Sequence, residues 1–281
     1  MNAPVLRTSM RGAIEIYDVV KVFEVRGVCV PAVDHCSFSI RAGEICMIVG
    51  PSGCGKTTLL NAIAGFHGID SGSITLDGTL LCGPSQLVAP TGSDRIVVFQ
   101  NGALFPWKTN LDNVAFGPIV QKKLSKKEAH EKGSQLLAQA GLSGYEHKYP
   151  GELSSGLQRR VEIVRALMND PAVLLLDEPY RALDALSKSV MHEALLEIYY
   201  RTGVTIFFIT HDLEEAIFLG HRVVVMTSRP CRPKESFTID IPHPRRYEVL
   251  TSRRFRELAA EISAAVNEEA MKSFTLGERE G

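Results

Sequence analysis

The sequence has no long apolar run and almost no net charge. Its 281 residues include 31 lysines and arginines and 32 aspartates and glutamates, so the formal net charge is −1. A chain this close to neutrality has no electrostatic preference for a polyanion, and we expect no nucleic acid partner. Nowhere do about 18 apolar residues follow one another, as a membrane-spanning helix requires. We also expect no signal peptide, because the first residues lack an apolar core.

The sequence also lacks closely spaced pairs of cysteines. The chain has 6 cysteines, and none of them forms a CxxC motif. Metal sites and redox motifs usually show such spacing, and structural disulfides are rare in reducing compartments. We therefore expect reduced thiols, no cysteine-based metal site and a cytoplasmic protein. With 45% hydrophobic residues, the chain can form one large domain or two small ones.

One glycine-rich stretch organises the chain. An apolar run at 45–49 precedes it and an apolar-periodic run follows from Leu59, which predicts a strand, a loop and a helix. Gly50 stands four residues before Gly55-Lys56-Thr57, the spacing of a phosphate-binding loop. The predicted nucleotide contacts of this loop are Gly50, Pro51, Ser52, Gly53, Cys54, Gly55, Lys56, Thr57 and Thr58.

Each residue type in the loop suits a triphosphate. Glycines let the backbone approach closely and turn its N–H groups toward phosphate oxygens, beside a helix N-terminus. Lys56 can bridge the β- and γ-phosphates of ATP, and the Thr57 hydroxyl can ligate Mg²⁺. Kinases, GTPases and many ATPases share such a loop, so the loop alone leaves the reaction open.

Two consecutive carboxylates narrow the reaction. Asp177 ends the apolar run 174–176, and Glu178 follows it. Asp177 can hold Mg²⁺ through water, and Glu178 can orient and polarise an attacking water. This pair indicates a hydrolase rather than a phosphotransferase.

A second candidate phosphate site precedes another helix. Ser154, Ser155 and Gly156 lead into a run with Leu157 and Val161 on one face. The free N–H groups of that helix start form a second anion-binding terminus. A site so far along the chain is expected to serve the nucleotide of a neighbour, which predicts a head-to-tail dimer.

The remaining pattern indicates an α/β fold. Near-continuous apolar runs at 173–176, 205–209 and 223–226 are typical of parallel strands covered on both faces, and Val97–Phe99 is expected to be a further buried strand. Alternation from Ile14 to Val22 and a turn at Asp77-Gly78 predict short strands and a hairpin in a small antiparallel sheet. Residues 110–142 indicate helices, and the tail from Ser252 predicts a short amphipathic helix.

In chain order these motifs resemble the nucleotide-binding subunit of an ATP-binding cassette (ABC) transporter, over roughly residues 14–230. The resemblance implies a P-loop NTPase fold with a RecA-like parallel sheet, a small antiparallel β subdomain and an inserted α-helical subdomain. It places the ATPase domain at 14–245, its helical subdomain roughly at 101–165 and a helical tail at 246–281.

The resemblance also assigns roles. Gln100 matches the glutamine that contacts Mg²⁺ and the membrane partner, and His211 matches the histidine that contacts the γ-phosphate. Phe23 matches the aromatic residue that stacks on adenine, although Tyr17 is a rival for this role. The implied catalytic residues are Lys56, Glu178 and His211. The implied metal contacts are Thr57, Gln100 and Asp177. The implied further nucleotide contacts are Phe23, Gln100, Ser154, Ser155, Gly156 and Asp184.

Three positions depart from the family pattern. Ser155 replaces a signature glycine, Leu157 replaces the signature glutamine, and Arg181 replaces a serine before Asp184. A positive φ at Ser155 would cost about 1 kcal/mol. Because Glu178 and His211 are intact, we still expect a competent ATPase.

Within the family, the run from Val98 to Trp107 and the tail segment Ile241–Arg245 resemble importer subunits for nitrate, sulfonates and taurine. That likeness implies peripheral attachment at the cytoplasmic face of the membrane. The implied partners are a second copy, transmembrane permease subunits and, through the complex, a solute-binding protein. A soluble ABC-type ATPase is the alternative. Trp107 is expected either to anchor the permease or to belong to the core.

Overall fold

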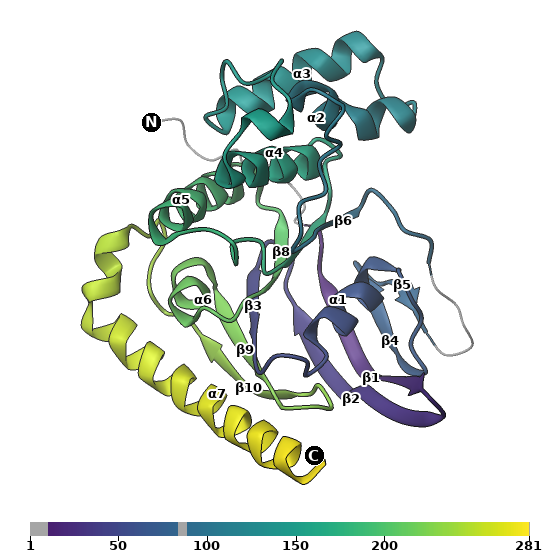
Figure 1. The fold of residues 1–281 in the computed structure, drawn as a ribbon, viewed down its shortest axis with the longest axis vertical. Coiled ribbons are helices and arrows are strands. Elements are labelled where there is room, and N and C mark those ends of the chain that lie inside the picture. Colours follow the sequence, from purple (N-terminus) through teal and green to yellow (C-terminus); the bar gives the residue numbers. More distant parts are fainter. Residues whose placement is uncertain (1–10, 84–88, 281) are drawn as a thin grey trace. The chain divides into compact units, whose positions relative to one another are not determined.

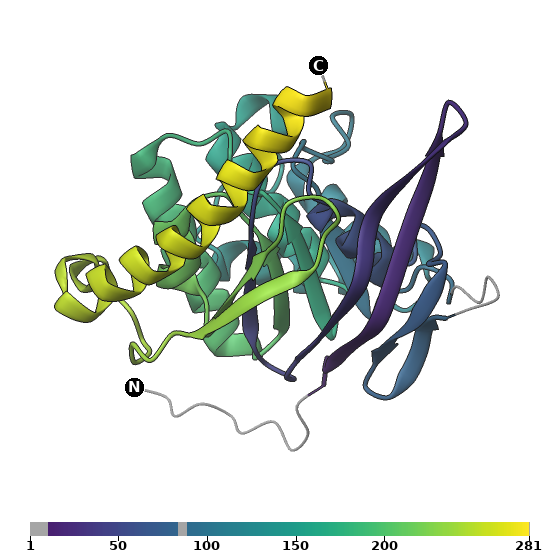
Figure 2. The same cartoon turned by 90° about the horizontal axis from the view of Figure 1, so that it is seen from below.

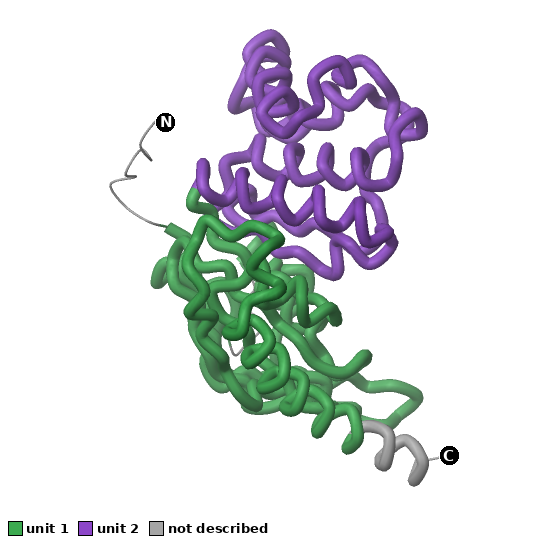
Figure 3. Tube along the Cα trace, turned by 90° about the vertical axis from the view of Figure 1, so that its left-hand side faces the viewer, with its two compact units in different colours: residues 1, 3–91, 203–281 green, residues 2, 92–202 purple. Residues whose placement is uncertain are grey.

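The structure is a computed structural model that describes residues 11–83 and 89–280. These residues divide into two compact units (Figure 3). The first unit contains the described residues before 92 and after 202, and the second contains residues 92–202. Each unit contains both strands and helices (Figure 1).

An antiparallel sheet with the order β2-β1-β4-β5 belongs to the first unit. Its strands are β1 (Ile14–Val25), β2 (Val28–Ile40), β4 (Ser71–Leu76) and β5 (Thr79–Cys82). The predicted hairpin is confirmed: Asp77 and Gly78 have φ values of 49° and 77°, as a tight turn between twisted strands requires. The expectation of short strands is wrong for β1 and β2, which are 12 and 13 residues long. In β1, register shifts between Ile16 and Val22 interrupt the alternation of buried and exposed residues, although the strand itself is continuous.

The first unit also holds the strand that leads into the glycine-rich loop. β3 lies between β8 and β9 in parallel register, and β10 pairs antiparallel with β9. These strands are β3 (Ile45–Val49), β8 (Thr205–Ile209), β9 (Arg222–Met226) and β10 (Pro233–Thr238). All five residues of β3 and of β8 are buried, which explains their unbroken apolar sequence.

Helices complete the first unit. They are α1 (Lys56–Ala64), α6 (Leu213–Leu219), α7 (Arg253–Glu280) and the 3₁₀ turn η2 (Tyr247–Thr251). The predicted amphipathic tail is confirmed as α7, the long yellow helix in Figure 2, although it is longer than expected. It packs against α6 and β9, with Phe255, Leu258 and Ile262 buried. No described helix is both long and apolar enough to cross a membrane.

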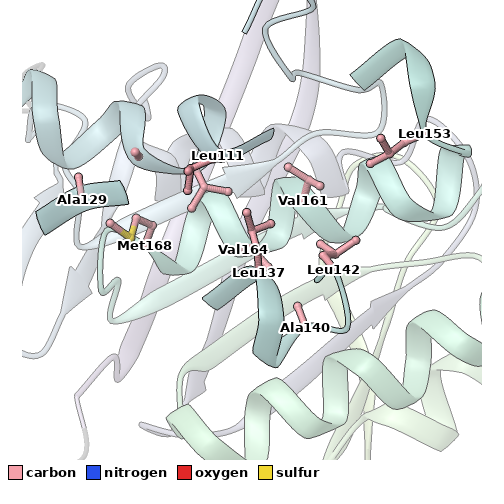
Figure 4. Packing of buried hydrophobic residues seen from close by; sticks show 11 residues of the cluster. Leu111, Ala129, Leu137, Ala140, Leu142, Leu153, Val161, Val164 and Met168 are labelled. Atoms are coloured by element: carbon pink, nitrogen blue, oxygen red, sulfur yellow. The ribbon is translucent and has the colours of Figure 1, made fainter. Parts of the chain in front are cut away.

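The second unit combines a parallel strand pair with helices. Its elements are β6 (Arg95–Val98), α2 (Asn110–Val120), α3 (Lys126–Gln139), η1 (Pro150–Glu152), α4 (Ser155–Leu167), β7 (Val173–Asp177) and α5 (Ala185–Thr202). The predicted helical region is confirmed, and residues such as Leu111, Leu137, Val161 and Val164 form its core (Figure 4). The prediction of a buried strand over Val97–Phe99 is wrong at its last residue, because Phe99 lies beyond the end of β6 and is 43% exposed.

Candidate nucleotide site

The glycine-rich loop joins β3 to α1, as the sequence predicts. Gly53 and Gly55 have φ values of 72° and 122°, which L-residues with side chains rarely adopt. A Cβ placed on Gly55 would lie 2.2 Å from the carbonyl oxygen of Ala32. The loop is therefore packed against β2 so closely that residue 55 has no room for a side chain.

Lys56 begins α1 and is buried. Its Nζ donates to the carbonyl oxygens of Gly50 at 2.9 Å and of Pro51 at 2.7 Å. The ammonium group is thus held along the inside of the loop, where a phosphate oxygen could replace these carbonyls. Thr57 is exposed at the start of α1, and its hydroxyl is a hard oxygen donor of the kind that Mg²⁺ prefers.

His211 lies at the same sheet edge as the loop. Ile48 of β3 is in register with Ile209 of β8, so Gly50 and His211 each follow two residues later. The turn is fixed by Thr210, whose hydroxyl accepts from the Asp212 amide at 3.0 Å and donates to the Glu215 carboxylate. His211 itself is exposed. In the first unit, Lys56 and the predicted γ-phosphate contact His211 therefore follow neighbouring parallel strands at the same edge of the sheet.

Both candidates for adenine stacking lie on β1. Phe23 meets His67 edge-on with ring centroids 5.8 Å apart, and Lys21 Nζ lies 5.3 Å from the Phe23 centroid. His67 follows α1, so Phe23 contacts the segment that leaves the helix of the phosphate loop. Tyr17 is more exposed than Phe23. Stacking on adenine stays a prediction for Phe23.

The second unit carries the two predicted carboxylates. Asp177 is the buried last residue of β7, and Glu178 follows with a φ of 43°. A non-glycine residue in this conformation is strained by about 1–3 kcal/mol, a cost often found at functional sites. Glu178 Oε2 accepts from Gln100 Nε2 at 3.4 Å and from Arg181 Nη1 at 3.1 Å. The structure thus brings Gln100 and Glu178 together.

The signature loop enters α4 with ordinary helix-start geometry. Ser154 is the N-cap, and its hydroxyl accepts from the Leu157 amide at 3.4 Å. Ser155 is the first helical residue, so the positive φ considered for it is wrong and its Cβ causes no backbone strain. Asp184 accepts from the Ser187 hydroxyl and amide at 2.6 and 2.9 Å, and these bonds lower the pKa of its carboxyl group.

Sequence reasoning missed one buried ion pair. Arg159 donates to the carbonyl oxygens of Phe99 at 2.6 Å and Gln100 at 2.7 Å, and it pairs with Glu162 at 2.5 Å. Glu162 also accepts from the Ala103 amide. Both side chains extend from α4, so the helix that starts at the signature loop also fixes the backbone around Gln100. An Arg and a Glu three residues apart on an otherwise apolar helix face were the available signal.

Beyond Gln100, aromatic residues surround a pocket. Trp107 is 71% exposed, so the expectation that it belongs to the core is wrong. Its ring lies 5.7 Å from that of Phe105, which also contacts Phe116 at 4.9 Å. Phe105, Phe116 and Arg165 help to line a pocket of about 300 Å³. Two cations lie over these rings: the Arg165 guanidinium is 5.5 Å from the Phe105 centroid, and Lys108 Nζ is 5.1 Å from the Phe116 centroid.

Comparison with known proteins supports the resemblance to ABC transporter subunits. The ABC transporter family model matches residues 33–181, which is more than half of the chain. The taurine import ATP-binding protein TauB of Rhizobium johnstonii is 42% identical over 86% of this chain and 91% of its own length. The nitrate import ATP-binding protein NrtD of Synechocystis sp. is 41% identical over 89% of this chain and 94% of its own length.

Solved structures agree. A dimeric post-hydrolysis state of the ATP-binding cassette MJ0796, bound to ADP and Pi, aligns with a TM-score of 0.70 and 26% identity. The match covers 82% of this chain and all of that cassette. The α/β architecture is therefore that of a P-loop cassette, and a nucleotide is its ligand. The chain belongs to the ABC transporter family as one of its ATP-binding subunits, an ATPase.

Proposed function

We propose that the chain energises an importer for a small oxyanion, of the taurine and sulfonate type or of the nitrate type. The observation that carries this proposal is the identity of 41–42% to TauB and NrtD over nearly the whole chain. The exposed Trp107 supports it, because an importer ATPase needs an interface for a membrane subunit. The chain is expected to attach to the cytoplasmic face of the membrane through that subunit.

At the nucleotide, Lys56 would neutralise the β- and γ-phosphates, and Thr57, Gln100 and Asp177 would hold Mg²⁺. The loop itself fits a triphosphate: the Lys56 ammonium rests on two carbonyl oxygens, and residue 55 has no room for a side chain. Mg²⁺ would supply charge neutralisation in the transition state. Glu178 would take a proton from the attacking water, and His211 would stabilise the γ-phosphate.

The signature loop would act on the nucleotide of a second copy. Ser154 and Ser155 are exposed at the N-terminus of α4, where free N–H groups and the helix dipole favour an anion. The dimeric form of the related cassette with ADP and Pi supports this arrangement. ATP would close such a dimer, and hydrolysis would open it.

Phe105 and Trp107 would receive the permease. Aromatic residues beside a pocket and an arginine are typical interface anchors. Gln100 precedes Phe105 by five residues in the chain and contacts Glu178, so a permease bound at Phe105 and Trp107 would touch the segment that reaches the proposed catalytic carboxylate. A solute-binding protein would reach this chain only through the permease.

The proposal is tested with the complete transporter in lipid vesicles. ATP hydrolysis is measured with the binding protein empty, or loaded with taurine, another sulfonate or nitrate. We expect one of these solutes to stimulate hydrolysis. If none of the three stimulates a complex that hydrolyses ATP, the proposed solute class is wrong.

A further inference from the structure

Two cysteines far apart in sequence meet under the phosphate loop. Cys54 belongs to the loop and is 1% exposed, whereas Cys231 lies in the segment between β9 and β10 and is fully buried. Cys231 Cβ lies only 2.8 Å from where a Cβ on Gly55, the residue after Cys54, would stand, and each thiol is the largest single influence on the pKa of the other. Neither the family role of the loop nor the catalytic residues above account for this pair.

Backbone contacts hold Cys231 in place. Its amide donates to the Ala32 carbonyl oxygen at 2.9 Å, and its own carbonyl oxygen accepts from the Asp34 amide at 3.2 Å. A Cβ placed on Gly55 would lie only 2.8 Å from Cys231 Cβ. Backbone hydrogen bonds therefore fix Cys231 to β2, in contact with Gly55, the residue between Cys54 and Lys56.

The surroundings give the two thiols different roles. The hydrogen bond from Cys231 lowers the pKa of Cys54 to about 6 against the opposing effect of burial, and the Lys56 ammonium adds to the lowering. Lys56 Nζ lies 3.8 Å from Cys54 Sγ. The pKa of Cys231 is raised by its bond to Cys54 and by burial. Because the Lys56 ammonium lies beside Cys54, it favours the negative charge on Cys54, which is assigned as the nucleophile, while Cys231 keeps its proton.

We propose that Cys54 and Cys231 form a reversible disulfide that switches off nucleotide binding at the phosphate loop. The inference rests on the proposed role of this loop in holding the triphosphate. A disulfide bond is about 2.05 Å long, much shorter than a thiol–thiol hydrogen bond. Its formation draws residue 54 toward the fixed Cys231, turns the loop N–H groups away from the phosphates and removes the thiolate beside Lys56.

The oxidant is a small hydroperoxide such as hydrogen peroxide. The Cys54 thiolate attacks one peroxide oxygen, the O–O bond breaks, and the departing hydroxide takes up a proton to become water. Cys231 sulfur then attacks the sulfenic sulfur of Cys54, and the S–O bond breaks. The second hydroxide takes the Cys231 proton, so two electrons pass from the sulfurs to the peroxide and two waters form. A dithiol reductant reverses the change by thiol–disulfide exchange.

The test uses the full chain with peptide mapping by mass spectrometry and titration with ADP. After hydrogen peroxide treatment, we expect a peptide that links Cys54 to Cys231 and an affinity for ADP that falls by about tenfold or more. Dithiothreitol restores the affinity, and saturating ADP during the treatment prevents the link. Cys29→Ser, which removes the exposed cysteine of β2, behaves like the wild type. Cys231→Ala loses both the link and the reversibility.

The outcomes separate the inference from the proposed function. If the reduced wild type does not bind ADP, the proposed nucleotide site is wrong, whatever the cysteines do. If it binds ADP and peroxide links Cys36 to Cys231, or links no cysteines at all, the inference is overturned. A Cys54–Cys231 link that leaves the ADP affinity unchanged overturns it as well. These results come from the wild-type chain and do not depend on the folding of a variant.

Discussion

The Arg181 guanidinium donates to Glu178 Oε2 at 3.1 Å, so the proposed catalytic carboxylate already has a cationic partner three residues away. The resemblance to the family motif implies a serine at this position. The arginine side chain is 66% exposed, which makes the pair weak. The contact still competes with water for the carboxylate oxygen that would accept a proton.

The first prediction is that Arg181→Ser raises ATP hydrolysis, because the change frees Glu178. The gain should be modest, roughly 2–5-fold, as expected for an exposed ion pair worth at most about 1 kcal/mol. Steady-state hydrolysis by the assembled transporter measures it. Arg201→Ser is the matched control, since Arg201 also pairs with a glutamate but on α5. A fall in hydrolysis for Arg181→Ser alone would mean that Arg181 assists the reaction.

The second prediction concerns Gly55→Ala. The added methyl group would meet the Ala32 carbonyl oxygen at 2.2 Å in a backbone conformation unsuited to alanine. We expect a loss of about 1–3 kcal/mol in the free energy of unfolding, together with weaker ADP binding. Chemical denaturation and ADP titration measure the two effects. Gly151→Ala is the control, because its methyl group would meet no atom within 4 Å. Equal behaviour of the two variants would contradict the close packing of the loop.

The third prediction concerns Trp107→Ala. Since this side chain is 71% exposed, its removal should change the free energy of unfolding by no more than about 0.5 kcal/mol. Assembly with the membrane subunit should weaken by roughly 2–4 kcal/mol, the scale of an interface anchor. Thermal melting and co-purification measure these effects, with Tyr200→Ala, another exposed aromatic, as the control. Normal assembly would remove Trp107 from the interface.

The fourth prediction concerns pH and the tail helix. Glu269 of α7 is buried, and its carboxylate accepts from the Ser228 amide at 2.9 Å and from Lys272 at 2.8 Å. Burial opposes the charge, but the bonds from Lys272, Ser228 and Lys234 prevail and hold its pKa below the ordinary 4.5. Its stabilising effect is therefore present above pH 4.5 and is lost as the pH falls through its folded-state pKa.

Melting temperatures of the wild type and Glu269→Gln, measured from neutral pH downward, check this effect. The wild type should melt higher at neutral pH, and the difference should shrink as the pH falls below about 4.5. A difference that stays constant over that range would show that Glu269 acts through packing rather than charge.

The sequence predicted the elements whose signal is local. β3, β8 and β9 appear as continuous apolar runs because both of their faces are buried. Asp77-Gly78 marks a turn because its backbone geometry favours those two residue types. The chain order of the motifs at Lys56, Glu178 and His211 indicated the family.

Features that depend on tertiary contacts were not predictable in the same way. The Arg159–Glu162 pair depends on where the segment at Gln100 crosses α4, and the Cys54–Cys231 contact joins segments 177 residues apart in sequence. Ser155 was compared with a family glycine, although its place at the first turn of α4 requires no special backbone conformation. The adenine contact and the dimer contacts also depend on groups that are distant in sequence or belong to another molecule, and they stay predictions.

The most direct test of the account is solute uptake by the complete transporter in sealed vesicles, with wild-type chain or with Glu178→Gln. Wild-type vesicles should accumulate taurine, another sulfonate or nitrate only when ATP is supplied. Glu178→Gln should bind ATP normally but lower hydrolysis by about 10²–10⁴-fold, the scale of a lost general base, and uptake should fall with it. Uptake that continues at the wild-type rate with Glu178→Gln would contradict the claim that hydrolysis at this site drives import.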